Sequence, residues 1–109
     1  MGIQEDAAEL LTYFYIKYNE DESVDANKLL ADLKWDGKKA DRAMQYLKDL
    51  HAVNITLFFG NVDGLQSFNF NKLTPIGINM VEDKKQFKKT FNIEVNLLFA
   101  KFGWGAQER

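Results

Sequence analysis

Three side chains that can donate several hydrogen bonds recur at helical spacing in the middle of the chain: Lys38, Arg42 and Gln45. Residues three and four positions apart lie on one face of a helix, so these side chains form a single stripe. Arg matches the acceptor edge of guanine, Gln matches adenine, and Lys contacts phosphate oxygens. The chemistry that the stripe favours is therefore hydrogen bonding to phosphates or to base edges.

Further charged side chains flank this stripe. Lys39 and Lys48 are expected to contact phosphates at its edges, and Lys34 lies just before it. Asp41 and Asp49 lie beside it, and their carboxylates would repel phosphates. Binding to a nucleic acid should therefore be modest, and should depend on dimerisation or steeply on salt. The alternative interpretation is an ordinary solvated helix face.

The residue types that catalysis needs are scarce. The chain has no Cys and a single His, His51, which is expected to end a helix, where it meets the helix dipole or simply packs. Ser23 and Ser67 lie apart from any base, and no glycine-rich phosphate loop follows a strand into a helix. The sequence therefore predicts that the protein is not an enzyme and has neither a metal site nor a cofactor.

Length and composition predict one globular domain. The 109 residues are 46% hydrophobic and 14% aromatic, which suits a single core. The absence of Cys gives no sign of an oxidising compartment, and no stretch approaches the roughly 18 apolar residues of a membrane span. The start lacks a basic patch followed by an apolar run. We therefore expect a cytoplasmic protein that does not enter a membrane.

The charge is divided along the chain. Residues 1–33 carry eight acids and two lysines, a net charge of −6, whereas residues 34–109 carry twelve Lys and Arg against eight acids, a net charge of +4. An anionic partner should therefore bind the second part. Mixed charges of this kind are also typical of an ordinary solvated surface, so charge alone does not decide between the two.

Hydrophobic spacing predicts three helices in the first half of the chain, over residues 5–18, 25–33 and 38–51. Ser23 or Asp25 can cap the second helix and Asp36 the third. The second and third helices are separated by the short turn Trp35-Asp36-Gly37. Two helices joined by a tight turn that contains Gly are the helix-turn-helix signature.

A hairpin follows, with strands expected over residues 53–59 and 65–72. The turn between them contains Asn, Asp and two Gly, the residues that a hairpin loop requires. Thr74 then suits the N-cap, and Pro75 the first position, of a further helix. Asp83 can cap another short helix.

The order of these elements, together with Leu73-Thr74-Pro75-Ile76-Gly77, resembles the small winged helix-turn-helix regulators of prokaryotes, in which such a motif leads from the hairpin, called the wing, into a helix. The resemblance covers about residues 7–83. It implies an α+β fold with a three-helix core, a two-stranded wing and a following helix, which we expect to form a domain over residues 1–90. It also implies that helix 38–51 enters the major groove while the wing tip, including Asn61, reaches the adjacent backbone or minor groove.

The tail, residues 91–109, alternates between apolar and polar residues from Phe91 to Phe99, which predicts an extra C-terminal strand. Helix 5–18 is apolar on more than one side, so either a partner subunit or the tail of the same chain should cover its second side. Our preferred hypothesis is a homodimer built from the tail and helix 5–18. The expected interface residues are Leu10, Phe14, Phe91, Ile93, Val95, Leu97 and Phe99.

The densest basic run is Lys84, Lys85, Lys88 and Lys89. It is either a second patch that contacts phosphates or, as is more common, the solvent-exposed face of a helix anchored by aromatic residues. The sequence does not decide between these alternatives.

The resemblance implies a DNA-binding transcription regulator that acts on double-stranded DNA, as a dimer, with repression by occlusion of the site and without a cofactor. The competing hypothesis is a winged helix that docks onto another protein, which the acidic first helix and the wing tip without Lys or Arg would favour. The sequence does not identify an operator or a small-molecule effector.

Overall fold

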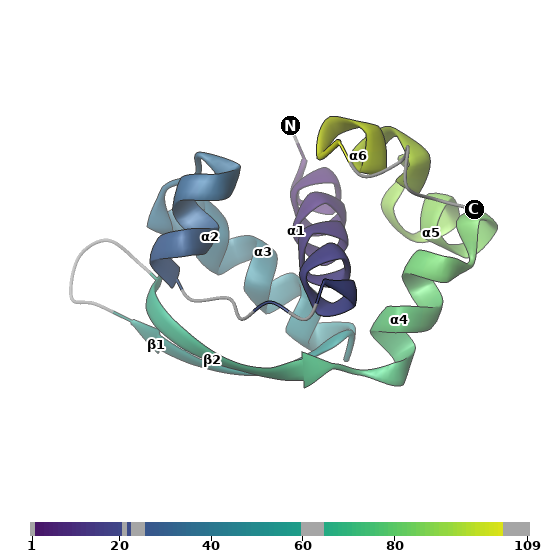
Figure 1. The fold of residues 1–109 in the computed structure, drawn as a ribbon. Helices are drawn as coiled ribbons and strands as arrows, with labels where there is room; N and C mark the ends of the chain where they lie inside the picture. The colour runs from purple at the N-terminus through teal and green to yellow at the C-terminus, as the bar shows by residue number, and fades with distance from the viewer. Residues whose placement is uncertain (1, 21, 23–25, 60–64, 104–109) are drawn as a thin grey trace.

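The computed structural model describes residues 2–20, 22, 26–59 and 65–103, which form six helices and one antiparallel pair of strands (Figure 1). In chain order the elements are α1 (Ile3–Asn19), α2 (Ala26–Leu33), α3 (Gly37–Asp49), β1 (Val53–Phe59), β2 (Leu65–Leu73), α4 (Pro75–Glu82), α5 (Lys84–Phe91) and α6 (Val95–Lys101).

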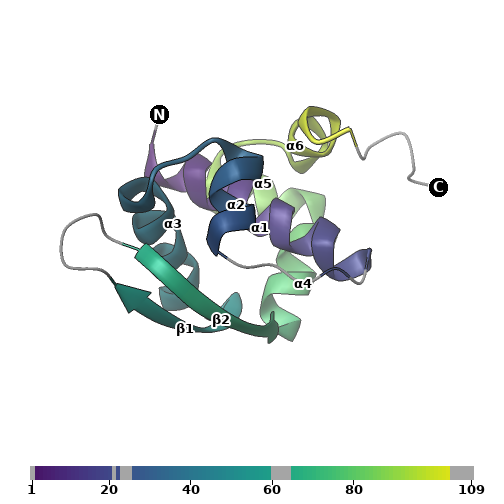
Figure 2. The ribbon, with the colours of Figure 1, turned by 60° about the vertical axis from the view of Figure 1, so that its left-hand side comes forward.

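Helix α1 lies at the centre of the molecule. Figures 1 and 2 place α2 and α3 on one side of it and α4 and α5 on the other, and α1 contacts α3, α4, α5, α6 and β2. Every residue of α1 from Ala7 to Phe14 is buried. Thr12 tolerates this burial because its hydroxyl donates a hydrogen bond to the carbonyl of Ala8 (2.8 Å). The several apolar sides of α1 are therefore covered by the chain's own helices.

Both ends of α3 are fixed by local structure. At its start the Asp36 carboxylate accepts a hydrogen bond from the amide of Lys39 (2.9 Å), which confirms the expected N-cap. Lys34 before the helix and His51 after it adopt the left-handed conformation, with φ of 60° and 63°. The amide following each of them bonds a carbonyl five residues back, so α2 and α3 both end in a Schellman turn without Gly.

The hairpin pairs Val53 with Leu73 at its base and Phe59 with Leu65 at its far end. Val53 and Leu73 are buried in the core, which anchors the base of the hairpin to the helices. The predicted turn, residues 60–64, lies outside the described residues.

The Leu-Thr-Pro-x-Gly motif joins the end of α3 to the start of α4. The Thr74 hydroxyl accepts a hydrogen bond from the amide of Gly77 (3.0 Å) and donates one to the carbonyl of His51 (2.6 Å). Pro75 occupies the first turn of α4, as expected. Gly77 packs so closely that a Cβ atom there would collide with the carbonyl oxygen of Ala52. The motif therefore fixes the packing of α4 against the segment between α3 and β1.

The predicted fold class, an α+β winged helix-turn-helix with an extra C-terminal strand, is wrong. Helices make up most of the described residues, and the hairpin supplies the only strands among them. Residues 84–91 form α5, Asn92 turns the chain with a φ of 61°, and Val95–Lys101 form α6. The tail is helical because its buried residues also fit helical spacing within each helix: Phe91 follows Phe87 by four residues in α5, and Val95, Leu98 and Phe99 lie on one side of α6.

The tail covers α1 in the same chain, which was the alternative to a dimer interface. Of the seven expected interface residues, Leu10, Phe14, Phe91, Val95 and Phe99 are buried in the chain's own core. Ile93 is half-buried and Leu97 is 61% exposed. The interface prediction is therefore corrected for the five buried side chains, because they have no surface left for a partner. A homodimer stays a prediction and would have to form without these five side chains.

Candidate nucleic-acid interface on α3

Helix α3 has a buried face and an exposed face. Ala40, Ala43, Met44 and Leu47 are buried, and α3 packs mainly against α1 through this face. Positions on the opposite side of a helix follow from the turn of 3.6 residues. The exposed face carries three of the expected binding residues along one line: Lys38, Arg42 and Gln45, with Asp49 one turn further on.

The basic side chains on this face are available to a ligand. Lys38, Arg42 and Lys48 are exposed, and none of them forms a salt bridge with another described residue. The amide nitrogen of Gln45 donates a hydrogen bond to the Asp41 carboxylate at 3.1 Å. This bond holds the Gln45 side chain on the exposed face and partly occupies the neighbouring acid. We define Lys38, Arg42, Gln45 and Lys48 as the α3 stripe.

Lys39 differs from the α3 stripe, because its side chain turns back toward α1. Its ammonium nitrogen lies 3.7 Å from the Asp6 carboxylate and 5.0 Å from the centre of the Trp35 ring. One Asp6 oxygen is buried and accepts no hydrogen bond within the described part of the chain, so the ammonium of Lys39 compensates its charge. Lys39 therefore ties α3 to α1 rather than extending the exposed stripe.

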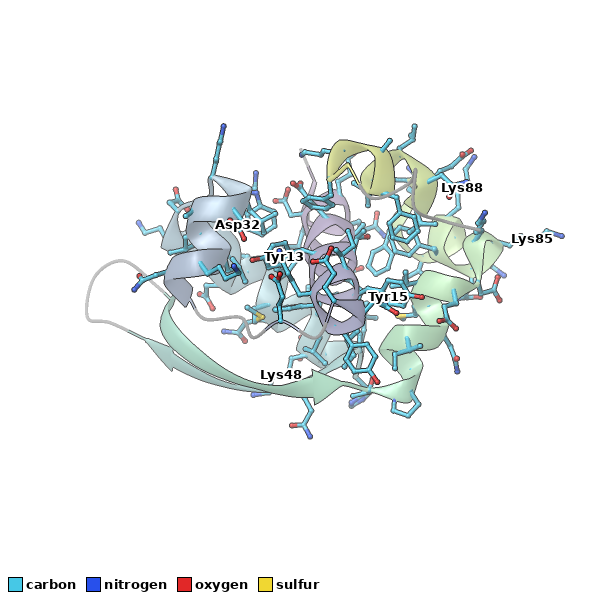
Figure 3. All side chains as sticks on the ribbon, viewed as in Figure 1. Tyr13, Tyr15, Asp32, Lys48, Lys85 and Lys88 are labelled. Carbon is cyan, nitrogen blue, oxygen red and sulfur yellow. The ribbon has the colours of Figure 1, made fainter. Side chains whose placement is uncertain are left out.

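Lys34 and Lys48 mark the two ends of the candidate site. Lys34 is exposed in the turn between α2 and α3, before the first helical residue of α3. Lys48 lies near the other end, at the lower edge of the molecule in Figure 3. Beside Lys48 is an open hollow of about 700 Å³, which the exposed His51 and the first residues of β1 also line. Asn61, the expected contact at the hairpin tip, lies outside the described residues.

The charge of the site is mildly positive. Lys34 and the three basic residues of the α3 stripe are offset by the carboxylates of Asp41 and Asp49, which share the exposed side of α3. Asp49 continues the line of the stripe and would approach any phosphate that Gln45 approaches. The arrangement can attract a polyanion, but more weakly than an unbroken basic face would.

A contact that the sequence did not suggest positions the helix pair. The Tyr13 hydroxyl of α1 donates a hydrogen bond of 2.7 Å to the Asp32 carboxylate of α2, and Figure 3 shows the two side chains converging. This bond fixes α2 on α1, and so fixes the turn from which α3 begins. The only feature of the sequence that pointed to this contact is the position of Tyr13 outside the main apolar stripe of α1.

In the described part of the chain, no group of three or more His, Cys, Asp or Glu side chains could hold a metal ion. None of the helices that the structure describes is both long enough and apolar enough to span a bilayer.

Comparison of the chain with protein-family models, with curated proteins and with solved structures found no match.

Proposed function

We propose that the protein binds double-stranded DNA through the α3 stripe and regulates transcription, with repression by occlusion as the consequence. The observation that carries the proposal is the set of exposed Lys, Arg and Gln side chains along one face of α3. The opposite face of the helix is held in the core. These are the side chains that proteins use for phosphates, guanine and adenine.

The position of α3 suits entry into the major groove. Its 13 residues span about 20 Å, and a major groove about 12 Å wide admits a helix. Helix-turn-helix proteins contact bases mainly through the N-terminal residues of the second helix. Lys38 and Arg42 lie in the N-terminal half of α3, so they are the expected base or phosphate contacts, and Lys48 is expected to meet the backbone at the far end.

The acidic residues of the same face supply a test of opposite sign. Arg42→Ala removes an expected contact, whereas Asp49→Asn removes a charge that would repel a phosphate. Both positions are exposed, so both variants should fold as stably as the original, within about 0.5 kcal/mol. If α3 faces DNA, the first variant binds more weakly and the second more tightly.

The experiment is fluorescence-polarisation binding to a pool of duplexes of random sequence, at about 50 and 200 mM salt. We expect salt-dependent binding by the original protein. Lys38→Ala/Arg42→Ala should reduce the slope of the logarithm of the binding constant against the logarithm of the salt concentration by about 2, whereas Asp49→Asn should strengthen binding at both salt concentrations.

Unchanged binding by both variants would overturn the proposal for α3. The absence of binding by the original protein would instead favour the competing function, a domain that docks onto another protein.

A further inference from the structure

Helix α5 carries a second basic surface, which the proposed role of α3 leaves unexplained. All four of its lysines are exposed. We define the α5 lysine patch as Lys84, Lys85, Lys88 and Lys89.

The helix that carries the patch is firmly anchored. Phe87 and Phe91 are fully buried beneath it, with ring centres 4.8 Å apart. The Asp83 carboxylate caps its first turn by accepting a hydrogen bond from the amide of Gln86 (3.1 Å). At 3.6 residues per turn the four lysines spread over less than half of the helix circumference. Their backbone positions are therefore fixed on one side of a rigid element.

The chain compensates part of this charge, because Glu82 and Asp83 line a neighbouring hollow of about 950 Å³ together with Lys84 and Lys85. Among the described residues, the only salt bridge of the patch joins Lys88 to Glu94 at 3.5 Å, and both side chains are more than half exposed. An exposed pair of this kind contributes little. Lys84, Lys85 and Lys88 also line a hollow of about 210 Å³ together with Glu94, Val95 and Asn96. The patch thus presents a surface of net positive charge with a shallow recess.

The α5 lysine patch and the α3 stripe lie on different sides of the molecule. Figure 1 places α3 and α5 on different sides of α1, which contacts both helices. Each helix buries the face that packs into the core, so each exposes the face that points outward. Figure 3 accordingly shows Lys85 and Lys88 on one side of the molecule and Lys48 at its lower edge.

The chemistry of the patch fits phosphates rather than bases. Lysine ammonium groups act as point charges, and they lack the paired hydrogen-bond geometry that Arg, Asn and Gln use to distinguish bases. The one amide side chain of α5, Gln86, already donates a hydrogen bond to the Thr90 hydroxyl (3.0 Å). The patch would therefore bind a phosphate backbone without regard to sequence.

We propose that the α5 lysine patch is a second DNA-binding surface, which contacts the phosphates of a duplex segment other than the one held by α3. One chain then bridges two segments, or two parts of one looped duplex. Bridging rests on the proposed function of α3, whereas phosphate binding by the patch does not.

The test uses the full chain in three variants. The first replaces all four patch lysines by Gln, the second replaces them by Arg as a control that keeps the charge, and the third is Lys38→Ala/Arg42→Ala. Polarisation with a short duplex of mixed sequence measures the salt dependence of binding. Capture of a labelled duplex on an immobilised duplex by the added protein measures bridging.

We expect the original protein and the Arg variant to bridge. The Gln variant should bind through α3, fail to bridge, and show a salt slope smaller by about 2 to 4. A Gln variant with unchanged slope and bridging would overturn the inference, as would an original protein that binds one duplex without bridging.

The two proposals fail in distinguishable ways. Loss of all binding in the α3 variant, with no effect of the Gln substitutions, would leave the function of α3 in place and remove that of the patch. Loss in the Gln variant alone would leave the patch as the DNA-binding surface and overturn the proposal for α3. A protein that binds no duplex would overturn both.

Discussion

Two regions of this chain have a similar sequence pattern and different structures. Residues 53–59 and 65–73 form the two strands of a hairpin. Residues 91–97 alternate between apolar and polar side chains without a break, over a longer stretch than in either strand. Residues 91–99 nevertheless form the end of α5, a left-handed turn and most of α6.

The difference shows that alternation predicts a strand only where a partner strand is available. An isolated strand leaves its amides and carbonyls unpaired, whereas a helix satisfies them internally. The tail also has a second pattern, because Phe91 continues the buried side of α5 four residues after Phe87, and Val95, Leu98 and Phe99 are spaced for one side of α6. Their burial against α1 favours the helical arrangement.

Truncation of Phe91 should give the largest effect and tests the comparison directly. Phe91 is completely buried, so Phe91→Ala should lower the free energy of unfolding by about 3–5 kcal/mol. Leu97, which an alternating strand would place on the same face, is 61% exposed, and Leu97→Ala should change it by less than about 0.5 kcal/mol. Urea unfolding measures both values.

Equal losses in the two variants would mean that the tail is a strand with both residues on its buried face. If Phe91→Ala does not fold, Phe91→Leu gives the same comparison with a smaller cavity.

The next largest effect should come from Gly77, whose close approach to Ala52 holds α4 against the base of the hairpin. The Cβ atom in Gly77→Ala meets the backbone carbonyl of Ala52, which cannot move without disturbing the start of β1. The expected loss is about 2–3 kcal/mol by thermal or urea unfolding. The control is Gly2→Ser, because a Cβ atom at Gly2 meets nothing within 4 Å. A stable Gly77→Ala protein would show that the base of the hairpin packs more loosely than described.

The ion pair between Lys101 and Glu9 should have an intermediate effect, since it ties the end of α6 to α1. Their charged atoms are 2.8 Å apart, and Glu9 is buried while Lys101 is more than half exposed. Lys101→Met leaves the Glu9 carboxylate without this partner and should cost about 1–2 kcal/mol, less than for a fully buried pair. Adding Glu9→Gln should recover part of the loss. Additive effects in this double-mutant cycle would show that the pair contributes nothing.

Asn92 should give the smallest effect, but its sign is informative. Its φ of 61° lies in the left-handed region, which Gly adopts without strain. Asn92→Gly should therefore raise the free energy of unfolding by about 0.5–1 kcal/mol, whereas Asn92→Ala should lower it. Gly in the middle of a strand destabilises, so a loss of stability in Asn92→Gly would contradict the helical tail.

Much of the local structure could be predicted from the sequence, because it depends on neighbouring residues. The caps by Asp36, Thr74 and Asp83 were predicted and are confirmed. The helices before the hairpin and the two short helices after it likewise follow from apolar spacing and N-cap residues. The predicted fold class was wrong because the sequence of the tail fits both a strand and a helix. Contacts with α1, some 80 residues earlier in the chain, favour the helix.

The candidate site could be predicted only in part. Helical spacing places Lys38, Arg42 and Gln45 on one face, and they do lie together on the exposed side of α3. The same spacing could not show that Lys39 turns to Asp6 and Trp35, because both partners come from other elements. Lys34 and His51 were assigned no backbone role, since a left-handed conformation is uncommon for residues other than Gly.

The central position of α1 has a consequence for the order in which the protein can fold during synthesis. Glu9 and Gln4 lie in α1, which is synthesised before α5 and α6, and they bond Lys101 and Thr90 some 90 residues later in the chain. The apolar residues of α1 stay exposed until α5 and α6 have been translated, and exposed apolar surface promotes aggregation. The nascent chain is therefore most prone to aggregation after α1 has been synthesised and before α5 and α6 can cover it.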